Sequence, residues 1–216
     1  MDYTPETGHG FPHDPFKSLT VPRPIGWIST RSTAGVDNLA PFSHFQNVMG
    51  RPPMVMFAAT QSPLGGRKDT VRNAEETGWF VWNMATWDLR DAVNRSSVAA
   101  PWGVDEFTLA GLTKAPSIES AVSRVAESPC HFECRYLQTI RLPGGGVDAV
   151  DMVIGQVTRV HIADHVIQAD GKVDIPLIKP LARLGYYDYA VVESVFEMKP
   201  PPAYAHDTLG VVGMDF

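Results

Sequence analysis

Short apolar stretches separated by turn-forming residues occupy much of the chain. Residues 25–31 change from apolar to polar, and the turn around Gly35 predicts a hairpin whose second strand covers residues 39–42. Residues 54–58 form a continuous apolar run of strand length, so we expect a strand that is buried on both faces. Another apolar run at residues 79–82 predicts the next strand.

Two later segments alternate with the period of two that is typical of strands. They cover residues 130–140 and 152–165, and the glycines at 144–146 form the turn between them. The first segment is expected to place Cys130, Phe132, Cys134, Tyr136 and Gln138 on one face and His131, Glu133, Arg135 and Leu137 on the other.

Helical signals are fewer and shorter than the strand signals. Residues 70–76 predict a helix that Asp69 caps and Gly78 ends, and residues 89–98 predict a second helix. Six or more short strands with two or three irregularly spaced helices indicate an α+β fold around an antiparallel barrel or sandwich. A doubly wound fold would need strands and helices in regular alternation, which the pattern lacks.

Length and charge narrow the class of protein. The 216 residues are 44% hydrophobic, which is enough for one domain around a single core. The net charge is -6, so we expect neither a nucleic-acid partner nor an anionic membrane, and any bound phosphate must be held locally. The chain has no run of about 18 apolar residues that could cross a bilayer. Residues 1–20 form a polar leader without the features of a secretory signal, so we expect a cytoplasmic protein.

The cysteines and histidines offer little for a metal or a disulfide. Cys130 and Cys134 lie four residues apart on a predicted strand, which separates their Cα atoms by about 13 Å. A disulfide spans at most about 7 Å, so we expect two reduced, buried thiols. His161 and His165 have the spacing of helical zinc ligands, but their surroundings predict a strand that runs into a turn. We therefore expect no metal site.

A cationic cluster precedes the first predicted helix in this acidic chain. Arg67, Lys68 and Thr70 place two cations and a hydroxyl where the orphan N–H groups and the dipole of the helix attract an anion. A phosphate group is the anion that we expect to bind here. Asp69 is expected to cap the helix or to orient Lys68, and its carboxylate is not expected to face the anion. The alternative is a solvated basic turn that Asp69 caps.

Two hairpin segments supply further polar groups. Ser29 and Thr30 end a strand with hydroxyls and N–H groups that could form hydrogen bonds to the polar parts of a ligand. Ala40 and Pro41 are small or rigid and would let a planar ring approach the main chain, and Ser43 adds a donor. The alternative is that these hydroxyls only satisfy a turn.

Four segments in this order resemble a known family. They are residues 21–30 (VPRPIGWIST), 38–43 (NLAPFS), 68–70 (KDT) with Asn73, and 183–186 (RLGY). Together they resemble the flavin reductase-like family of the FMN-binding split barrel fold, which includes flavoredoxin and the reductase components of monooxygenases. The resemblance implies an antiparallel, Greek-key-like split β-barrel with flanking helices over residues 21–192, followed by a C-terminal extension over residues 193–216.

The resemblance also implies a cofactor and a reaction. It implies one FMN per subunit at the interface of a homodimer, with Arg183 close to the flavin and to the subunit boundary. Hydride would pass from NADH or NADPH to the flavin, and from there electrons would reach free flavin, an oxygenase partner or another acceptor. No dedicated acid or base is needed, so no catalytic residue is expected. The implied cofactor-binding residues are Trp27, Ser29, Thr30, Asn38, Ala40, Pro41, Ser43, Arg67, Lys68, Asp69, Thr70 and Arg183.

Two other classes of function remain open on the sequence. An FMN electron carrier of the flavoredoxin type would use the same residues without a nicotinamide pocket, and a flavin-free binding protein would keep only the barrel. The sequence does not support a hydrolase or a nucleoside triphosphatase, because the glycine-rich and nucleophile motifs of these enzymes do not occur in the chain. Trp102, in a loop after Pro101, could cover a ring face, although simple packing is the commoner role of such a residue.

Overall fold

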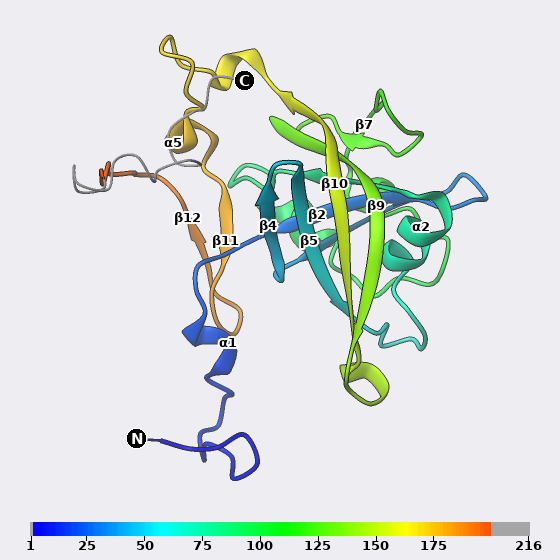
Figure 1. Ribbon diagram of the computed structural model, residues 1–216, viewed down its shortest axis with the longest axis vertical. Helices are drawn as coiled ribbons and strands as arrows, with labels where there is room; N and C mark the ends of the chain where they lie inside the picture. The colour runs from blue at the N-terminus through cyan, green and yellow to red at the C-terminus, as the bar shows by residue number, and fades with distance from the viewer. Residues whose placement is uncertain (1, 200–216) are drawn as a thin grey trace.

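The computed structural model describes residues 2–199, and an antiparallel seven-stranded sheet dominates it (Figure 1). The strands lie in the order β3-β2-β6-β9-β10-β5-β4, so segments far apart in the sequence become neighbours. This mostly antiparallel architecture with few helices confirms the predicted α+β split-barrel class. The strands are β2 (Gly26–Arg31), β3 (Asp37–Phe42), β4 (Phe45–Gly50), β5 (Pro53–Thr60), β6 (Trp79–Asn83), β9 (Cys130–Leu142) and β10 (Val150–Ile162).

Two smaller sheets and several short helices flank the main sheet. One small sheet contains β1 (Arg23–Pro24), β11 (Leu181–Arg183) and β12 (Tyr189–Val191), and the other pairs β7 (Lys114–Ala115) with β8 (Arg124–Val125). In Figure 1, α1, β11 and β12 lie together on one side of the molecule, away from α2. The helices are α1 (Phe16–Leu19), α2 (Asp69–Thr77), α3 (Arg90–Arg95), α4 (Glu106–Ala110) and α5 (Ile175–Ile178), with 3-10 turns η1 (Gly146–Asp148) and η2 (Asp164–Val166).

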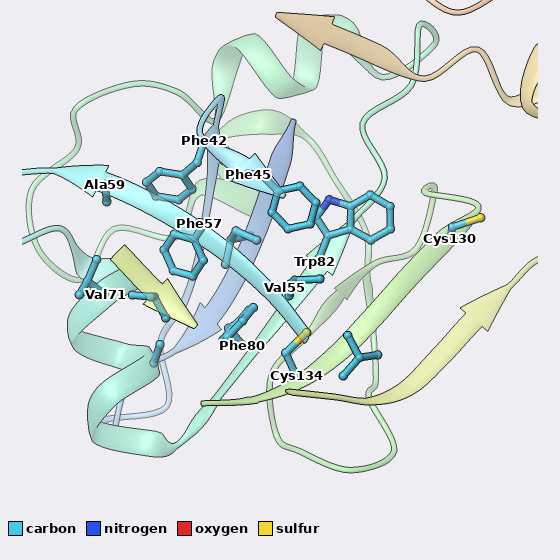
Figure 2. Close-up of a cluster of buried hydrophobic side chains, with 14 of the residues drawn as sticks. Phe42, Phe45, Val55, Phe57, Ala59, Val71, Phe80, Trp82, Cys130 and Cys134 are labelled. Carbon is cyan, nitrogen blue, oxygen red and sulfur yellow. The ribbon is translucent and has the colours of Figure 1, made fainter. Parts of the chain in front are cut away.

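The core fills the inside of the curved main sheet with aromatic side chains (Figure 2). Phe57 packs edge-on against Phe80 with ring centroids 5.4 Å apart, and Phe45 stacks on Trp82 at 5.6 Å. Gly155 of β10 faces this core, and a Cβ there would lie 2.4 Å from the Phe80 ring. Glycine is thus required at this position for the strand to pass over the aromatic cluster.

The long hairpin confirms the predicted alternation only in part, because register shifts between Ile154 and Gly155 and between Val157 and Arg159 interrupt it. Gln138 pairs with Ile154 and Tyr136 with Gly155, so Gln138 does not share the face of Tyr136, contrary to the prediction. β9 and β10 pair antiparallel, and Cys130 and Cys134 are free, buried thiols on the core face, as predicted. His131 and Glu133 are also buried, but on the opposite face.

Several predicted elements differ in detail from the observed ones. β5 is not buried on both faces: Val55, Phe57 and Ala59 are buried, while the alternate positions stay partly accessible because nothing covers that face completely. The helix expected at residues 89–98 is shorter and ends at Arg95, after which the chain enters a loop. Lys68, not Asp69, is the N-cap of α2, and Asp69 is the first helical residue.

The ends of the chain are only partly described. α1 lies within the predicted polar leader, and residues 193–199 form no helix or strand. Residues 200–216 of the predicted C-terminal extension lie outside the described residues. No helix within residues 2–199 is both long and apolar enough to span a membrane.

Candidate functional site

A small pocket of about 70 Å³ lies between β3, the start of α2 and the loop that follows α3. Six of the twelve predicted site residues line it: Asn38, Ala40, Pro41, Lys68, Asp69 and Thr70. The hairpin between β2 and β3 and the β5–α2 loop therefore deliver their polar groups to one place. The pocket also contains Phe42, Ser62, Ser96, Ser97, Val98, Ala100 and Glu106.

The first turn of α2 forms one wall of the pocket. The first N–H groups of an α-helix have no acceptor within the helix, and the helix dipole makes this end positive. Lys68, the N-cap, adds an ammonium group that belongs to no salt bridge between residues 2 and 199. This end of the pocket can therefore hold an anion.

A buried network of hydrogen bonds lies beneath the pocket. Asn38 Oδ1 accepts from Thr70 Oγ1 at 2.8 Å and from Thr30 Oγ1 at 3.2 Å. Asn73 Nδ2 donates to Thr30 Oγ1 at 3.1 Å. Because the Thr70 hydroxyl proton is used on Asn38, Thr70 can offer a ligand its backbone N–H but not its hydroxyl proton. Thr30 lies below the pocket and supports Asn38.

Glu106 of α4 is the buried charge of the site. Its Oε2 accepts from Asn38 Nδ2 at 2.9 Å and from the Leu39 N–H at 3.0 Å. Burial raises the pKa of Glu106, with a smaller contribution from the nearby Asp69 carboxylate, while the bonds to Leu39 and Asn38 oppose the shift. No motif in the sequence pointed to this residue, because a single glutamate on a short helix has no distinguishing pattern.

The loop after α3 covers the site and is tied to α2 at two points. The Asp69 carboxylate accepts the N–H of Gly103, and burial raises the pKa of this carboxyl group. The Arg72 guanidinium lies over the Trp102 ring, 3.8 Å from its centroid. Asp69 thus holds the covering loop, and Trp102 packs against a cation of the chain itself.

Arg67 is placed differently from its neighbour Lys68. It forms ion pairs with Glu75 at 2.5 Å and with the buried Asp151 at 3.1 Å, and it does not line the pocket. Arg141 also pairs with Asp151, at 2.8 Å. Arg67 therefore joins α2 to β10, and its charge is already compensated.

Two other predicted residues of β2 are buried away from the pocket. Trp27 is fully buried, and its Nε1 donates to Ser96 Oγ at 2.9 Å. Ser29 Oγ donates to the Ser123 carbonyl at 2.6 Å and accepts from Asn83 Nδ2 at 3.1 Å. Trp27 reaches the site only through Ser96, which lines the pocket.

The remaining predicted residues lie elsewhere in the chain. Ser43 lines a second pocket and not the first. Arg183 belongs to the three-stranded sheet of β1, β11 and β12, where it donates to Tyr189 Oη at 2.7 Å and to the Tyr186 carbonyl. The structure does not bring Arg183 to the first pocket.

A separate polar cluster lies on the outer face of β9 and β10. His161 Nε2 is 2.6 Å from Glu133 Oε1, and Glu133 also accepts the N–H groups of Ile118 and Glu119. Within the described part of the chain, no three His, Cys, Asp or Glu side chains are grouped to hold a metal ion. Glu133 thus anchors the loop that precedes β8.

Comparison with known protein families shows to which family the chain belongs. The model of the flavin reductase like domain family matches residues 18–191, which is most of the chain. The chain belongs to this family. The matched region, residues 18–191, includes all four segments on which the resemblance rests.

Relatives of this flavin reductase-like protein occur in Halalkalibacterium halodurans and Bacillus subtilis. An uncharacterised protein of Halalkalibacterium halodurans is 37% identical over 182 residues, which are 84% of this chain and 87% of that protein. An uncharacterised protein of Bacillus subtilis is 30% identical over 193 residues, 87% of this chain and 94% of that protein. The shared region is therefore nearly the whole of each relative.

Solved structures show the same fold. Nitrilotriacetate monooxygenase component B from Bacillus cereus superimposes with a TM-score of 0.82 at 32% identity, over 92% of this chain and 98% of that one. Flavoredoxin of Desulfovibrio vulgaris (Miyazaki F) gives a TM-score of 0.70 at 18% identity, over 87% and 94% of the two chains. At that lower identity the likeness shows the fold alone.

Proposed function

We propose that this flavin reductase-like protein binds FMN and transfers hydride from NADH or NADPH to it. The observation that carries the proposal is the pocket at the start of α2, where Lys68 and the orphan N–H groups face Asn38, Ala40 and Pro41. The family membership supports a flavin as the ligand. The names of two structural neighbours, a flavoredoxin and an FMN-binding protein, support the same choice.

The donor set of this pocket fits the phosphate of FMN. Lys68 supplies a positive charge, which also acts on the neighbouring Asp69 carboxylate, and the first turn of α2 supplies N–H donors. The Asp69 carboxylate is engaged with the Gly103 N–H, which reduces its repulsion of an anion. Pockets for whole drug-sized ligands measure about 300–1,000 Å³, so a pocket of about 70 Å³ suits the phosphate end only. The ring would lie beyond it.

The chain's own residues would bind and position the flavin, which supplies the redox chemistry when bound. The Thr30–Asn38–Thr70 network fixes β2, β3 and α2 relative to one another, so the pocket is rigid before a ligand arrives. The loop tied by Asp69 and Trp102 would exclude water from the phosphate end. No acid or base of the chain is needed for hydride transfer.

The acceptor, the assembly and the location follow as further parts of the proposal. The similarity to a monooxygenase component B favours an oxygenase partner, with free flavin or another acceptor as the alternatives. A homodimer would bring Arg183 of one subunit towards the flavin of the other, which would account for its distance from the pocket of its own chain. We expect the protein to act in the cytoplasm.

An FMN electron carrier remains the competing function, because it would use the same pocket. Anaerobic mixing of the FMN-loaded protein with NADH or NADPH separates the two. A reductase loses the flavin absorbance at a rate that saturates with nicotinamide concentration. If dithionite removes the absorbance while neither nicotinamide does, the protein is a carrier and hydride transfer from nicotinamide is wrong.

A further inference from the structure

A second pocket, of about 350 Å³, lies between the segment that contains α1 and β1 and the start of β4. Its volume is within the range of pockets that hold small organic ligands, about 300–1,000 Å³. Most of its wall is apolar by area, and Phe16, Pro22, Pro24, Phe45 and Met56 are the apolar residues that line it. Lys17, Thr20, Arg23, Ser43, His44 and Gln46 complete the lining.

The polar part of this wall carries only basic ionisable groups. Lys17, Arg23 and His44 line the pocket, and its lining contains no aspartate or glutamate. Lys17 is exposed and forms no salt bridge among the described residues. Burial lowers the pKa of His44, and the charges of Lys17 and then Arg23 lower it further. Lys17, Arg23 and His44 therefore lie close together, and within residues 2–199 no carboxylate forms a salt bridge with either of the two cations, in a protein whose net charge is -6.

Arg23 is held in place by the backbone around it. Its Nη1 donates to the carbonyls of Lys17 and of Thr20, the latter at 2.6 Å, and its Nη2 donates to the Leu184 carbonyl at 2.7 Å. Its Nε–H is buried and makes no hydrogen bond. All three partners are neutral carbonyls, so the guanidinium charge is fixed in position but not compensated.

We propose that this pocket binds a small aromatic carboxylate. The apolar wall, which includes Phe45 and Met56, would cover the ring, and the carboxylate would lie against the cations of Lys17 and Arg23. An inorganic anion would satisfy the charges but leave the apolar wall exposed to water. Phe42 lines the first pocket and Ser43 the second, so such a ligand would bind next to the proposed FMN site, although its binding does not depend on that proposal.

Three probes separate the contributions of ring and charge. Benzoate has both, benzamide keeps the ring without the charge, and acetate keeps the charge without the ring. Titrations of the full chain, followed by protein NMR, should give the tightest binding for benzoate. The ring signals of His44 should move as benzoate binds, and the pKa of His44 should rise because the anion offsets the two neighbouring cations.

Charge variants at Lys17 test the site without disturbing the core, because this side chain is exposed. Lys17→Gln should weaken benzoate binding by about two- to fivefold, Lys17→Glu should weaken it further, and benzamide binding should not change. Lys172→Gln, which removes an exposed lysine paired with Asp170, is the matched control and should leave all three affinities unchanged.

Three results would overturn the proposal. Equal affinities for benzoate and acetate would show a site for an adventitious anion only, in which the apolar wall has no role. Equal affinities for benzoate and benzamide, or benzoate binding that Lys17→Glu does not weaken, would show that the basic groups do not recognise the ligand. Failure to bind FMN in a separate titration would contradict the function proposed for the first pocket, and it would not change the interpretation of the benzoate titrations.

Discussion

Glu106 is the buried carboxylate whose protonation is coupled most directly to the pocket. Its pKa is raised in the folded protein, so between the ordinary pKa of about 4.5 and the raised value the native state holds more protons than the unfolded state. The free energy of unfolding should therefore fall as the pH rises through this window. Glu106→Gln should lack this part of the fall, because its amide does not ionise.

Urea unfolding of both proteins at several pH values between 4 and 8 measures this difference. Glu76→Gln, at an exposed position of α2, is the control and should follow the wild type. If the wild type and Glu106→Gln have parallel stability profiles, the Glu106 carboxylate does not titrate in this window.

Sequence reasoning located about half of the pocket and failed where side-chain direction decides the outcome. Asn38, Ala40 and Pro41 meet the KDT segment at one pocket, because a helix start and a strand end fix where Lys68 and Asn38 lie, and their binding of FMN stays a prediction. Arg67 is one residue from Lys68 but pairs with Glu75 and Asp151, and only the fold brings Asp151 next to it. Glu106 was missed for the same reason: its partners Asn38 and Leu39 are distant in the sequence.

At the scale of elements, the loop over the pocket should depend on its contact with α2. Trp102→Ala removes the ring under Arg72, and an exposed cation–π contact contributes about 0.5–1 kcal/mol. We expect the Gly103 amide, which the Asp69 carboxylate holds, to exchange its hydrogen about two- to fivefold faster. Hydrogen exchange followed by NMR measures this rate.

The chain contains a matched control for this variant. Trp87 is also exposed and also lies under an arginine, with Arg90 4.2 Å from its ring centroid. Trp87→Ala should leave the exchange of the Gly103 amide unchanged. An equal acceleration in both variants would mean that loss of stability in general, and not the contact with Arg72, controls the loop.

His131 connects two other elements, β9 and β8. It is buried, with Nε2 2.8 Å from the Val125 carbonyl, and burial lowers its pKa to about 4. The unfolded state therefore binds more protons than the native state between about pH 6.5 and 4, so stability should be lost as the pH falls through this range, by up to about 3 kcal/mol.

His131→Gln keeps a donor near Val125 but cannot titrate. The free energy of unfolding of this variant should fall less than that of the wild type between pH 6.5 and 4, as measured by urea unfolding. A difference that stays constant over this range would show that His131 does not titrate on unfolding.

At the scale of the whole molecule, the hairpin of β11 and β12 leaves aromatic side chains exposed to solvent. Tyr187 is 93% exposed, and Tyr186 and Tyr189 of the same hairpin are about half exposed, which favours a surface that a second subunit covers. Analytical ultracentrifugation should give twice the chain mass of 23.7 kDa. A single-chain mass at micromolar concentration would contradict the proposed homodimer and the role of Arg183 across its interface.

The fold as a whole was more predictable than its details. Alternation along the first part of β9 predicted that Cys130 and Cys134 face the core, because a strand has a period of two, but the register shifts of the hairpin end this alternation after Tyr136. The same rule failed for β5, since a continuous apolar run does not show whether a second layer covers the other face. The position of the three-stranded sheet depends on the pairing of β1 with β11, in which Arg23 lies opposite Arg183. No local pattern in the sequence predicts a contact between residues so far apart in the chain.

The central claim is that FMN binds with its phosphate at Lys68, and one set of titrations tests it most directly. FMN and riboflavin, which differ only in the phosphate, are titrated into the wild type, Lys68→Ala and the control Lys172→Ala, with flavin fluorescence as the signal. A charged hydrogen bond contributes about 1.5–3 kcal/mol, so Lys68→Ala should weaken FMN binding by about tenfold or more and leave riboflavin binding unchanged. Equal affinities of the wild type for FMN and riboflavin, or an unchanged FMN affinity in Lys68→Ala, would contradict the account.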